Sequence, residues 1–566
     1  MIASERQPTA GPGAVQRADP WQPWREHDTV LVVNFGGQYA HMISRRVREL
    51  GVYSELVEPG KLKATVEEKK PKAIILSGGP ESVYAPGAPH LEGWVPEPDM
   101  PVLGICYGFQ LITQALGGNV ERGRGEYGRT KILVEAEGDP IFEGWGKVEY
   151  AWMSHGDHVS TAPPGAVALA TSENGYLAAI RVDAMPRRGG GQSTASEMEN
   201  LEVKEGSKVP GKVYGVQFHP EVTHTAKGKL LISNFLFKVA RVRPTWGGED
   251  VISRAVEEIR AKVRPGEKVF CAVSGGVDST VAALITKAAV GDSLMTVLVD
   301  HGFLREGEAQ QALEALKRVG LSPSLVDARE KFASKLKGVS DPEEKRKAVG
   351  ETFAEVFEQF FSEDKALRWF VQGTTYPDVV ESGAVEGSHK IKSHHNVGGL
   401  PRWFSDDVGV LEPLRYLYKD EVRRLAKLLG AHEFADKHPF PGPGLAVRVI
   451  GEVTEAKLGV VRRASAIVEE ELRLAKVYDR VWQAFAVVGD DRWVGVRGDQ
   501  RHEGYVVTVR VVESEDGMTA DWARLPPELL ERISKRIYEE VPEVGMVTYA
   551  VTPKPPSTIE PCRIIT

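Results

Sequence analysis

Short apolar runs alternate with amphipathic stretches along much of this chain. The first runs are Thr29–Phe35, Val52–Val57, Ala73–Leu76 and Val102–Ile105, and a helical pattern over Tyr39–Leu50 stops at Gly51. Apolar runs this short are typical of buried strands. Strands that alternate with helices predict a parallel α/β sheet, and such sheets collect ligands at the carboxyl ends of their strands.

The same pattern starts again after residue 250 and then changes. Helical patterns at Ile252–Val263, Val281–Ala289 and Glu308–Val319 are interleaved with apolar runs at Lys268–Val273, Leu294–Val299, Ser324–Val326 and Trp369–Gln372. These elements predict a second doubly wound α/β unit. Beyond the proline-rich connector 438–444, helices at Val461–Leu474 and Pro527–Val541 and strands near Trp493–Arg497, Tyr505–Val511 and Met546–Val551 predict a small α+β domain. Such a domain with an exposed sheet favours a homodimer.

These patterns divide the chain into four segments. We expect a disordered extension over 1–27, a first α/β domain over 28–243, a second over 244–437 and the α+β domain over 438–566. The polar, glycine-rich stretch 184–211 reads as an inserted surface loop.

Composition narrows the class of protein. The 566 residues carry a formal net charge of −8 with 42% hydrophobic residues, which is ordinary for a globular chain and indicates no nucleic-acid surface. The three cysteines, Cys106, Cys271 and Cys562, are too few and too scattered for a disulfide framework. No apolar stretch approaches the ~20 residues that cross a bilayer, and residues 1–27 lack the apolar core of a signal peptide. We expect a soluble, cytoplasmic protein without a membrane partner.

The most informative turn is the stretch 272–280, which lies between an expected strand and an expected helix. It contains Ser274, Gly275, Gly276, Val277, Asp278, Ser279 and Thr280. Glycines let the backbone N–H groups approach a bound group, and a helix N-terminus adds free donors, so the turn predicts a phosphate cradle. It lacks the lysine of the common P-loop, and Asp278 is instead an acid that could hold Mg²⁺. The alternative is a plain glycine turn before a helix.

A second turn carries a candidate nucleophile. Cys106 stands between Gly104 and Gly108 at a strand end, which resembles a nucleophile elbow, and a helix N-terminus stabilises a thiolate. His219 and Glu221 follow the strand Val213–Phe218 and are two residues apart, so on extended backbone they point the same way. A buried structural cysteine is the alternative, but the combination favours a Cys–His–Glu triad.

The stretches 104–108 and 217–221 resemble the class I glutamine amidotransferase domain. The resemblance implies that Cys106 is the nucleophile, that His219 is the general base and then acid, and that Glu221 orients His219. It implies an oxyanion hole formed by the backbone N–H groups of Gly79 and Tyr107. It also implies that glutamine is held by Gln110, Ser154, His155, Gly156 and Asp157, and that ammonia forms by way of a glutamyl thioester.

The order of the domains resembles the glutamine-hydrolysing GMP synthase family. The specific segments are 372–378, 391–401, 438–445 and 554–560. The resemblance implies an ATP pyrophosphatase domain that uses MgATP to adenylylate XMP, which ammonia then converts to GMP. For ATP it implies Ser274, Gly275, Gly276, Val277, Asp278, Ser279, Val299, Gly373 and Lys392, with Asp278 on the metal. For XMP it implies Arg305, Gln500, Lys554, Ile559 and Glu560, and a lid would carry Asp378, Glu381, His394, His395 and Asn396.

The chain departs from this family pattern at a few positions. Asn34 replaces the usual acid before a Phe-Gly pair, and His301 stands where Asn is usual. The family chain normally ends just after the acid that matches Glu560, whereas here a tail that contains Cys562 follows.

Other interpretations of particular segments stay open. His389, His394 and His395 could instead bind a metal, although no second cluster of ligands stands near them in the sequence. The basic helix within Leu411–Leu429 reads as a solvated face. The whole chain could be another adenylylating amidotransferase, such as an NAD⁺ or asparagine synthetase, or a thiolating enzyme. It could also be a regulator that binds nucleotides without catalysis.

Overall fold

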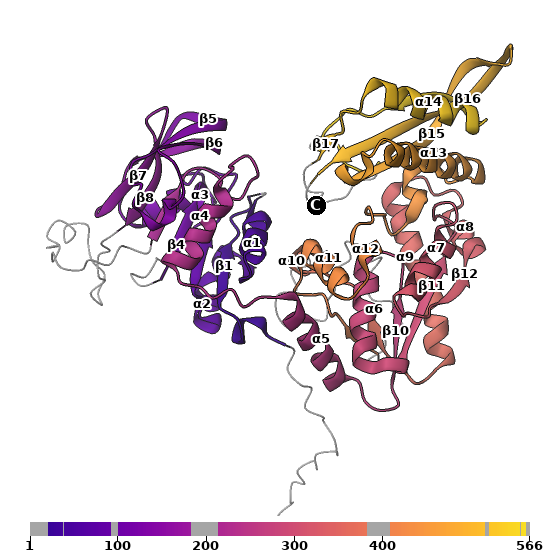
Figure 1. Ribbon diagram of the computed structural model, residues 1–566, viewed down its shortest axis with the longest axis horizontal. Helices are drawn as coiled ribbons and strands as arrows, with labels where there is room; N and C mark the ends of the chain where they lie inside the picture. Colours follow the sequence, from indigo (N-terminus) through magenta and orange to yellow (C-terminus); the bar gives the residue numbers. More distant parts are fainter. Residues whose placement is uncertain are drawn as a thin grey trace, which may run out of the picture. The chain divides into compact units, whose positions relative to one another are not determined.

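The computed structural model divides the chain into two compact units (Figure 1). It describes residues 21–37, 39–91, 100–182, 213–381, 408–514, 520–554 and 556–561. The N-terminal unit is Trp21–Gly247, and the C-terminal unit begins at Gly248. Among the described residues, no helix is long and apolar enough to span a membrane.

The N-terminal unit is built on a nine-stranded sheet with the order β2-β1-β3-β4-β9-β8-β7-β5-β6. Its parallel half consists of β1 (Thr29–Val33), β2 (Tyr53–Val57), β3 (Ala73–Leu76), β4 (Val102–Ile105) and β9 (Val213–Val216). Every residue of these strands is buried, because helices cover a parallel sheet on both faces. The helices are α1 (Ala40–Glu49), α2 (Leu62–Lys69), α3 (Tyr107–Ala115) and α4 (Gly228–Asn234). The expected parallel α/β sheet is confirmed.

An antiparallel extension of this sheet was not expected from the sequence. It consists of β5 (Asn119–Val134), β6 (Val148–Thr161), β7 (Ala166–Ser172) and β8 (Leu177–Val182), and β8 joins it to β9. Most side chains of β5 and β6 are exposed or half-buried. These strands therefore lack the continuous apolar runs by which a buried strand is recognised.

The segment from Trp21 to His27 corrects the expectation of a disordered extension. Pro23–Arg25 form the 3₁₀-helix η1, and the ring of Trp21 stacks on that of Trp246 with centroids 5.9 Å apart. His27 is buried and its Nδ1 lies 3.0 Å from Thr245 Oγ1. Aromatic burial against the end of the unit is therefore what orders these residues. Residues 1–20 and the expected insertion 184–211 lie outside the described residues.

The C-terminal unit begins with a parallel five-stranded sheet of order β12-β11-β10-β13-β14. The strands are β10 (Lys268–Ala272), β11 (Leu294–Asp300), β12 (Ser324–Asp327), β13 (Leu367–Val371) and β14 (Gly409–Leu411). The helices are α5 (Gly248–Lys262), α6 (Val277–Val290), α7 (Glu308–Arg318), α8 (Arg329–Leu336), α9 (Pro342–Glu363), α10 (Tyr376–Glu381), α11 (Lys419–Leu428) and α12 (His432–Ala435). The strand order reverses between β10 and β13, and such a reversal opens a ligand crevice at the carboxyl ends of the strands.

A smaller sheet completes this unit. β16 (Gln500–Glu513) pairs with β15 (Gln483–Arg497) and β17 (Asp521–Trp522) in antiparallel fashion and with β18 (Val544–Tyr549) in parallel. The helices α13 (Glu455–Leu474) and α14 (Pro527–Glu540) belong to the same part, and the short η7 (Gly444–Arg448) follows the proline-rich connector. Phe270 and Val297 share one buried cluster with Val461 and Val507, so the two parts of the unit have a common core.

His301 lies in the aromatic part of this core. Its ring centroid is 5.6 Å from Phe303, 5.7 Å from Phe332 and 5.6 Å from Phe353, and its Nδ1 accepts the N–H of Phe303. Burial lowers the pKa of His301 to about 4, although Asp300 and Glu308 act in the opposite direction.

This burial predicts a pH dependence of stability. Between pH 6.5 and about 4 the unfolded chain takes up a proton at His301 more readily than the folded chain, so the free energy of unfolding falls as the pH falls. From pH 7 to pH 5 this amounts to about 2 kcal/mol. Urea unfolding at the two pH values should show that His301→Asn loses this increment, whereas His432→Asn, at an exposed histidine, keeps it. Equal pH sensitivity in wild type and His301→Asn would contradict the assignment.

Candidate active sites

Cys106 occupies a strained turn between β4 and α3. Its backbone has φ +52° and ψ −106°, a conformation that side chains other than glycine rarely adopt. A Cβ at Gly108 would lie 2.4 Å from the carbonyl oxygen of Leu76, and one at Gly104 would lie 2.7 Å from the backbone of Gly108. The two glycines therefore let helix and strand approach closely enough to form the elbow.

The sheet brings His219 and Glu221 to the same edge as Cys106. β4 and β9 are parallel neighbours with Ile105 opposite Val216, so the residues that follow each strand meet. His219 Nδ1 lies 2.7 Å from Glu221 Oε1, and all three side chains are buried. A Cβ at Gly78 would lie 3.0 Å from His219 Cε1 and 3.8 Å from the Cβ of Cys106, so this glycine borders both groups.

The electrostatics suit an acid–base histidine. Burial alone would lower the pKa of His219, but the charges of Glu221 and Cys106 and their hydrogen bonds outweigh it. The pKa of His219 therefore lies well above its ordinary value. Glu221 fixes the proton on Nδ1 and leaves Nε2 for the exchange with sulfur.

The other residues that are predicted to bind the substrate glutamine lie around the Cys106 sulfur. Gly79 packs on the ring of Tyr107. Tyr107 is the first residue of α3, so no carbonyl group of a preceding helical turn accepts its backbone N–H. Cys106 Sγ is 3.7 Å from the carbonyl oxygen of Ser154. Gln110 Nε2 donates to the carbonyl oxygen of Asp157 at 2.9 Å, and His155 Nδ1 lies 2.8 Å from the same oxygen. Gly156 joins these residues on β6.

The segment called the loop 273–279 consists of the connection between β10 and α6 and the first residues of α6, at the reversal of the second sheet. Gly275 has φ +70°, and the N–H and hydroxyl of Ser274 lie 3.2 Å from the hydroxyl of Ser279. Gly276 caps α6, and Val277 is its first residue. The loop thus holds backbone and hydroxyl donors around a helix N-terminus, which is an anion-binding arrangement.

The two carboxylate oxygens of Asp278 have different surroundings. Its Oδ2 is 2.6 Å from the ammonium group of Lys419, at the start of α11, whereas its Oδ1 is buried and has no hydrogen-bond partner. A Cβ at Gly373, just after β13, would lie 3.5 Å from the Cβ of Asp278. The structure therefore brings Gly373 against Asp278, with a free carboxylate oxygen of the kind that Mg²⁺ prefers. Val299 is buried on β11.

The expected lid is only partly described. Asp378 Oδ2 accepts the N–H of Thr375 at 2.8 Å and its hydroxyl at 2.7 Å, so one carboxylate oxygen stabilises the start of α10. Glu381 ends this helix. Lys392, His394, His395 and Asn396, together with the alternative metal ligand His389, lie outside the described residues.

Arg305, which is expected to contact XMP, lies against Phe440, and so does Arg448, which binds the XMP candidate Glu560. The guanidinium of Arg305 is 4.6 Å from the centre of the Phe440 ring and forms an ion pair with Glu469 at 3.0 Å. The guanidinium of Arg448 is 5.1 Å from the same ring and binds Glu560 through two hydrogen bonds of 2.9 and 3.1 Å.

The remaining XMP candidates are more scattered. Ile559 is buried against residues of the small sheet, and Lys554 forms a backbone bridge to Ala520. Gln500 is exposed at the turn between β15 and β16, a hairpin that projects from the sheet in Figure 1. Among the described residues, no contact joins Gln500 to Arg305.

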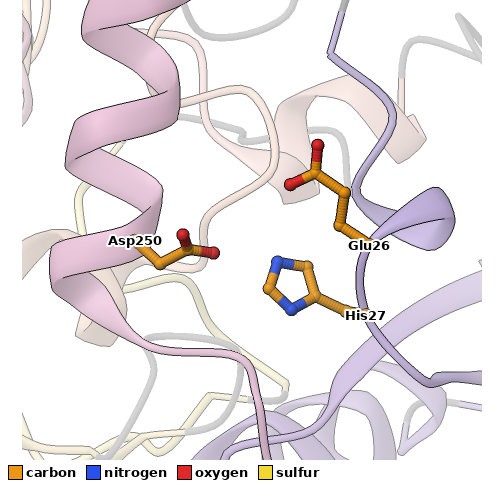
Figure 2. A group of neighbouring side chains, drawn as sticks. All are labelled: Glu26, His27 and Asp250. Atoms are coloured by element: carbon orange, nitrogen blue, oxygen red, sulfur yellow. The ribbon is translucent and has the colours of Figure 1, made fainter.

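Figure 2 shows Glu26, His27 and Asp250, which have the side chains of potential metal ligands. Glu26 and His27 belong to the N-terminal unit, and Asp250 lies on α5 in the C-terminal unit. Because they come from separate units, we assign no cation site to them.

Three family models match successive parts of the chain. The model of class I glutamine amidotransferases matches residues 31–192 and 191–239, that of NAD synthase matches 250–355, and that of the GMP synthase C-terminal domain matches 470–561. The chain is 55% identical over 538 residues to a glutamine-hydrolysing GMP synthase of Pyrobaculum aerophilum, with 94% of this chain and 100% of the relative covered. The corresponding proteins of Aquifex aeolicus and Thermobifida fusca are 49% and 48% identical, each over at least 94% of this chain and 98% of the relative.

The chain belongs to the glutamine-hydrolysing GMP synthase family.

Sequence reasoning missed several residues of these sites. The sequence predicts a solvated basic face for the helix that contains Lys419, yet this lysine contacts Asp278. Arg448, which binds Glu560, lay in a segment read only as following a connector. A sequence signal for Arg448 does exist: it is a charged residue within the apolar stretch Ala446-Val447-Arg448-Val449. A charge in such a stretch indicates a buried partner, because a charge is rarely buried alone.

The two described cysteines should differ sharply in reactivity. Burial raises the pKa of Cys271 to about 12, so this thiol stays protonated at neutral pH. In a Cys562→Ser background, iodoacetamide at pH 7.5 should alkylate Cys106 in the folded protein and Cys271 only after denaturation, as read by peptide mass spectrometry. His219→Asn should slow alkylation of Cys106 by roughly tenfold or more, because the buried base is lost. Labelling of Cys271 in the native protein would refute this distinction.

Proposed function

We propose that this chain makes GMP from XMP, with glutamine as the nitrogen source and ATP as the activating nucleotide. The observation that carries the proposal is an intact Cys106–His219–Glu221 geometry in a chain that matches GMP synthases almost from end to end. Purified protein supplied with XMP, MgATP and glutamine should form GMP, glutamate, AMP and pyrophosphate. If pyrophosphate is released without dependence on XMP, or not at all, the proposal fails.

The first reaction takes place at the elbow. His219 first takes the proton of the Cys106 thiol. The resulting thiolate attacks the glutamine amide carbon, and the N–H groups of Gly79 and Tyr107 stabilise the oxyanion. His219 then protonates the departing ammonia. Water, deprotonated by His219, releases glutamate from the thioester and restores the thiol.

The second reaction takes place at the loop 273–279. The oxygen on C2 of XMP attacks the α-phosphorus of ATP, and pyrophosphate leaves into the cradle of backbone and hydroxyl donors. Ammonia then adds at C2 and AMP leaves with the oxygen, so that a poor leaving group has been replaced by a good one. Asp278 would hold Mg²⁺ through its unpartnered oxygen, and the ion would neutralise charge on the phosphates.

Residues of the small sheet complete the XMP site in this proposal. Arg305, Lys554, Ile559 and Glu560 would contact the nucleotide, and Lys392 and the rest of the lid would close over ATP. Gln500 stands on an exposed hairpin, a position from which it could serve a second copy of the chain. We therefore propose a homodimer, which the mass in solution tests. A panel of XMP, deamido-NAD and aspartate separates this activity from that of other adenylylating amidotransferases.

Replacing the nucleophile should separate the two reactions. Cys106→Ala removes the sulfur that forms the thioester, so glutamine-dependent GMP formation should fall by at least about 1,000-fold. GMP formation from added ammonium should remain within about twofold of wild type, because the second reaction uses no residue of the elbow. Cys271→Ala is the matched control. Loss of the ammonium-dependent rate in Cys106→Ala would contradict the division of labour.

Replacing the proposed metal ligand should abolish synthesis from either nitrogen source. Asp278→Asn keeps the shape but removes the charge, and we expect GMP formation with glutamine or ammonium to fall by roughly 100-fold or more. Asp292→Asn, an exposed change shortly after α6, should leave both rates unchanged. Undiminished synthesis by Asp278→Asn would exclude Asp278 from the metal site.

A further inference from the structure

A buried carboxyl group and a buried histidine meet on the antiparallel strands β5 and β6, beside residues that are expected to hold glutamine. Glu126 on β5 lies opposite His155 on β6, and Glu126 Oε2 is 3.1 Å from His155 Nε2. Both side chains are almost completely buried, with exposed fractions of 1% and 2%. The mechanism proposed above assigns no role to Glu126.

A bulge aims Glu126 into the protein. Between the pairs Arg122–Asp157 and Glu126–His155, β5 advances four residues while β6 advances two. Gly125, just before Glu126, has φ +71° and allows this irregularity. Bulges next to active sites commonly re-aim a side chain, and here the result is a buried carboxylate on a strand that is otherwise largely exposed.

The partners of His155 fix the orientation of its ring. Nδ1 faces the carbonyl oxygen of Asp157, which can only accept, and Nε2 faces the carboxyl group of Glu126. Burial would raise the pKa of Glu126, but hydrogen bonds from His155, Asn174 and Ser172 outweigh burial and hold this pKa below its usual range. His155 therefore ties the side chain of Glu126 to the backbone of β6 at Asp157.

The pair begins a chain of hydrogen bonds that ends at the nucleophile. The carbonyl oxygen of Asp157 also accepts from Gln110 Nε2, at 2.9 Å. The same Nε2 lies 3.4 Å from Gln217 Oε1, and Gln217 Nε2 lies 3.6 Å from Cys106 Sγ. Because a carbonyl oxygen cannot donate, Gln110 must present its NH₂ to Asp157 and Gln217, and Gln217 must present its own NH₂ to the sulfur.

We infer that Gln217 is a further catalytic residue, which donates an N–H to the Cys106 thiolate, and that Glu126 and His155 are positioning residues that set its orientation. The inference rests on the proposed glutaminase reaction and adds residues to it. No oxidant or further reactant is involved: the amide N–H stabilises the negative sulfur before attack and again when the thioester is hydrolysed. A donor to a charged atom in a buried site is among the stronger hydrogen bonds in proteins.

The test uses the full-length enzyme and three variants. Gln217→Leu removes the donor, and Glu126→Gln with His155→Phe removes the pair without leaving an unpaired buried charge. Each should lower glutamine-dependent GMP formation and the rate of Cys106 alkylation by roughly 10–100-fold, which is what a hydrogen bond to a charged group is worth. The third variant combines all three substitutions. If Glu126 and His155 act through Gln217, it should be no slower than Gln217→Leu alone.

The controls separate this inference from the proposed function. GMP formation from ammonium should be unchanged in all three variants, and Glu121→Gln, an exposed change on the same strand, should leave every rate unchanged. If wild type makes no GMP from ammonium, the proposed function fails. If it does, but Gln217→Leu alkylates and turns over within about twofold of wild type, the network inference alone is overturned. If the rate losses of Gln217→Leu and of the variant Glu126→Gln with His155→Phe multiply in the combined variant, Glu126 and His155 do not act through Gln217, and their positioning role is overturned.

A measurement on the unmodified protein applies even if a variant does not fold. In wild type with ¹⁵N-labelled glutamine side chains, the NH₂ signal of Gln217 should shift when Cys106 is alkylated, because the amide then no longer donates to a thiolate. The signal is assigned by its absence in Gln217→Leu or in the nearly isosteric Gln217→Glu. A Gln217 signal that alkylation leaves unchanged would overturn the inference.

Discussion

The N-terminal site depends on a reversal of the backbone within a single residue. Cys106 can adopt a positive φ because Gly104 and Gly108 let the strand, the turn and the helix pack without a Cβ between them. The strain at Cys106 is balanced by the burial of β4 and α3 around it. Once the elbow forms, the pairing of β4 with β9 brings His219 beside the sulfur, and no long-range loop has to supply the base.

The C-terminal site is also built on a turn that follows a parallel strand, but its polar and charged groups differ from those of the N-terminal site. Its loop also follows a parallel strand and has a glycine at positive φ, but it holds hydroxyl and backbone donors where the first site holds a thiol. The carboxylate of Asp278 lies at the helix N-terminus, where backbone dipoles favour a negative charge. Lys419 compensates one of its oxygens and leaves the other free, so the site is arranged for a cation and a polyphosphate together.

Buried charges elsewhere in the chain are compensated in pairs. Glu221 with His219, Glu126 with His155, and Glu560 with Arg448 each join a carboxylate to a cationic or protonatable group out of contact with water. Such pairs add little net stability compared with an apolar core, because desolvation offsets their attraction. Their value lies in specificity of position: each fixes a side chain or a chain segment at a candidate site.

The local patterns determined the framework of this protein. Apolar runs identified the parallel strands apart from β14, and glycine turns after two of these runs identified the elbow at Cys106 and the loop at Asp278. These features depend on residues only a few positions apart. The antiparallel strands β5 and β6 escaped detection, since strands whose side chains are mostly exposed or half-buried carry no continuous apolar run. Only the tertiary structure decided which distant charges meet. Lys419 reaches Asp278 across 141 positions and Arg448 reaches Glu560 across 112, and such contacts follow from the order of strands in a sheet, which periodicity along the chain does not encode.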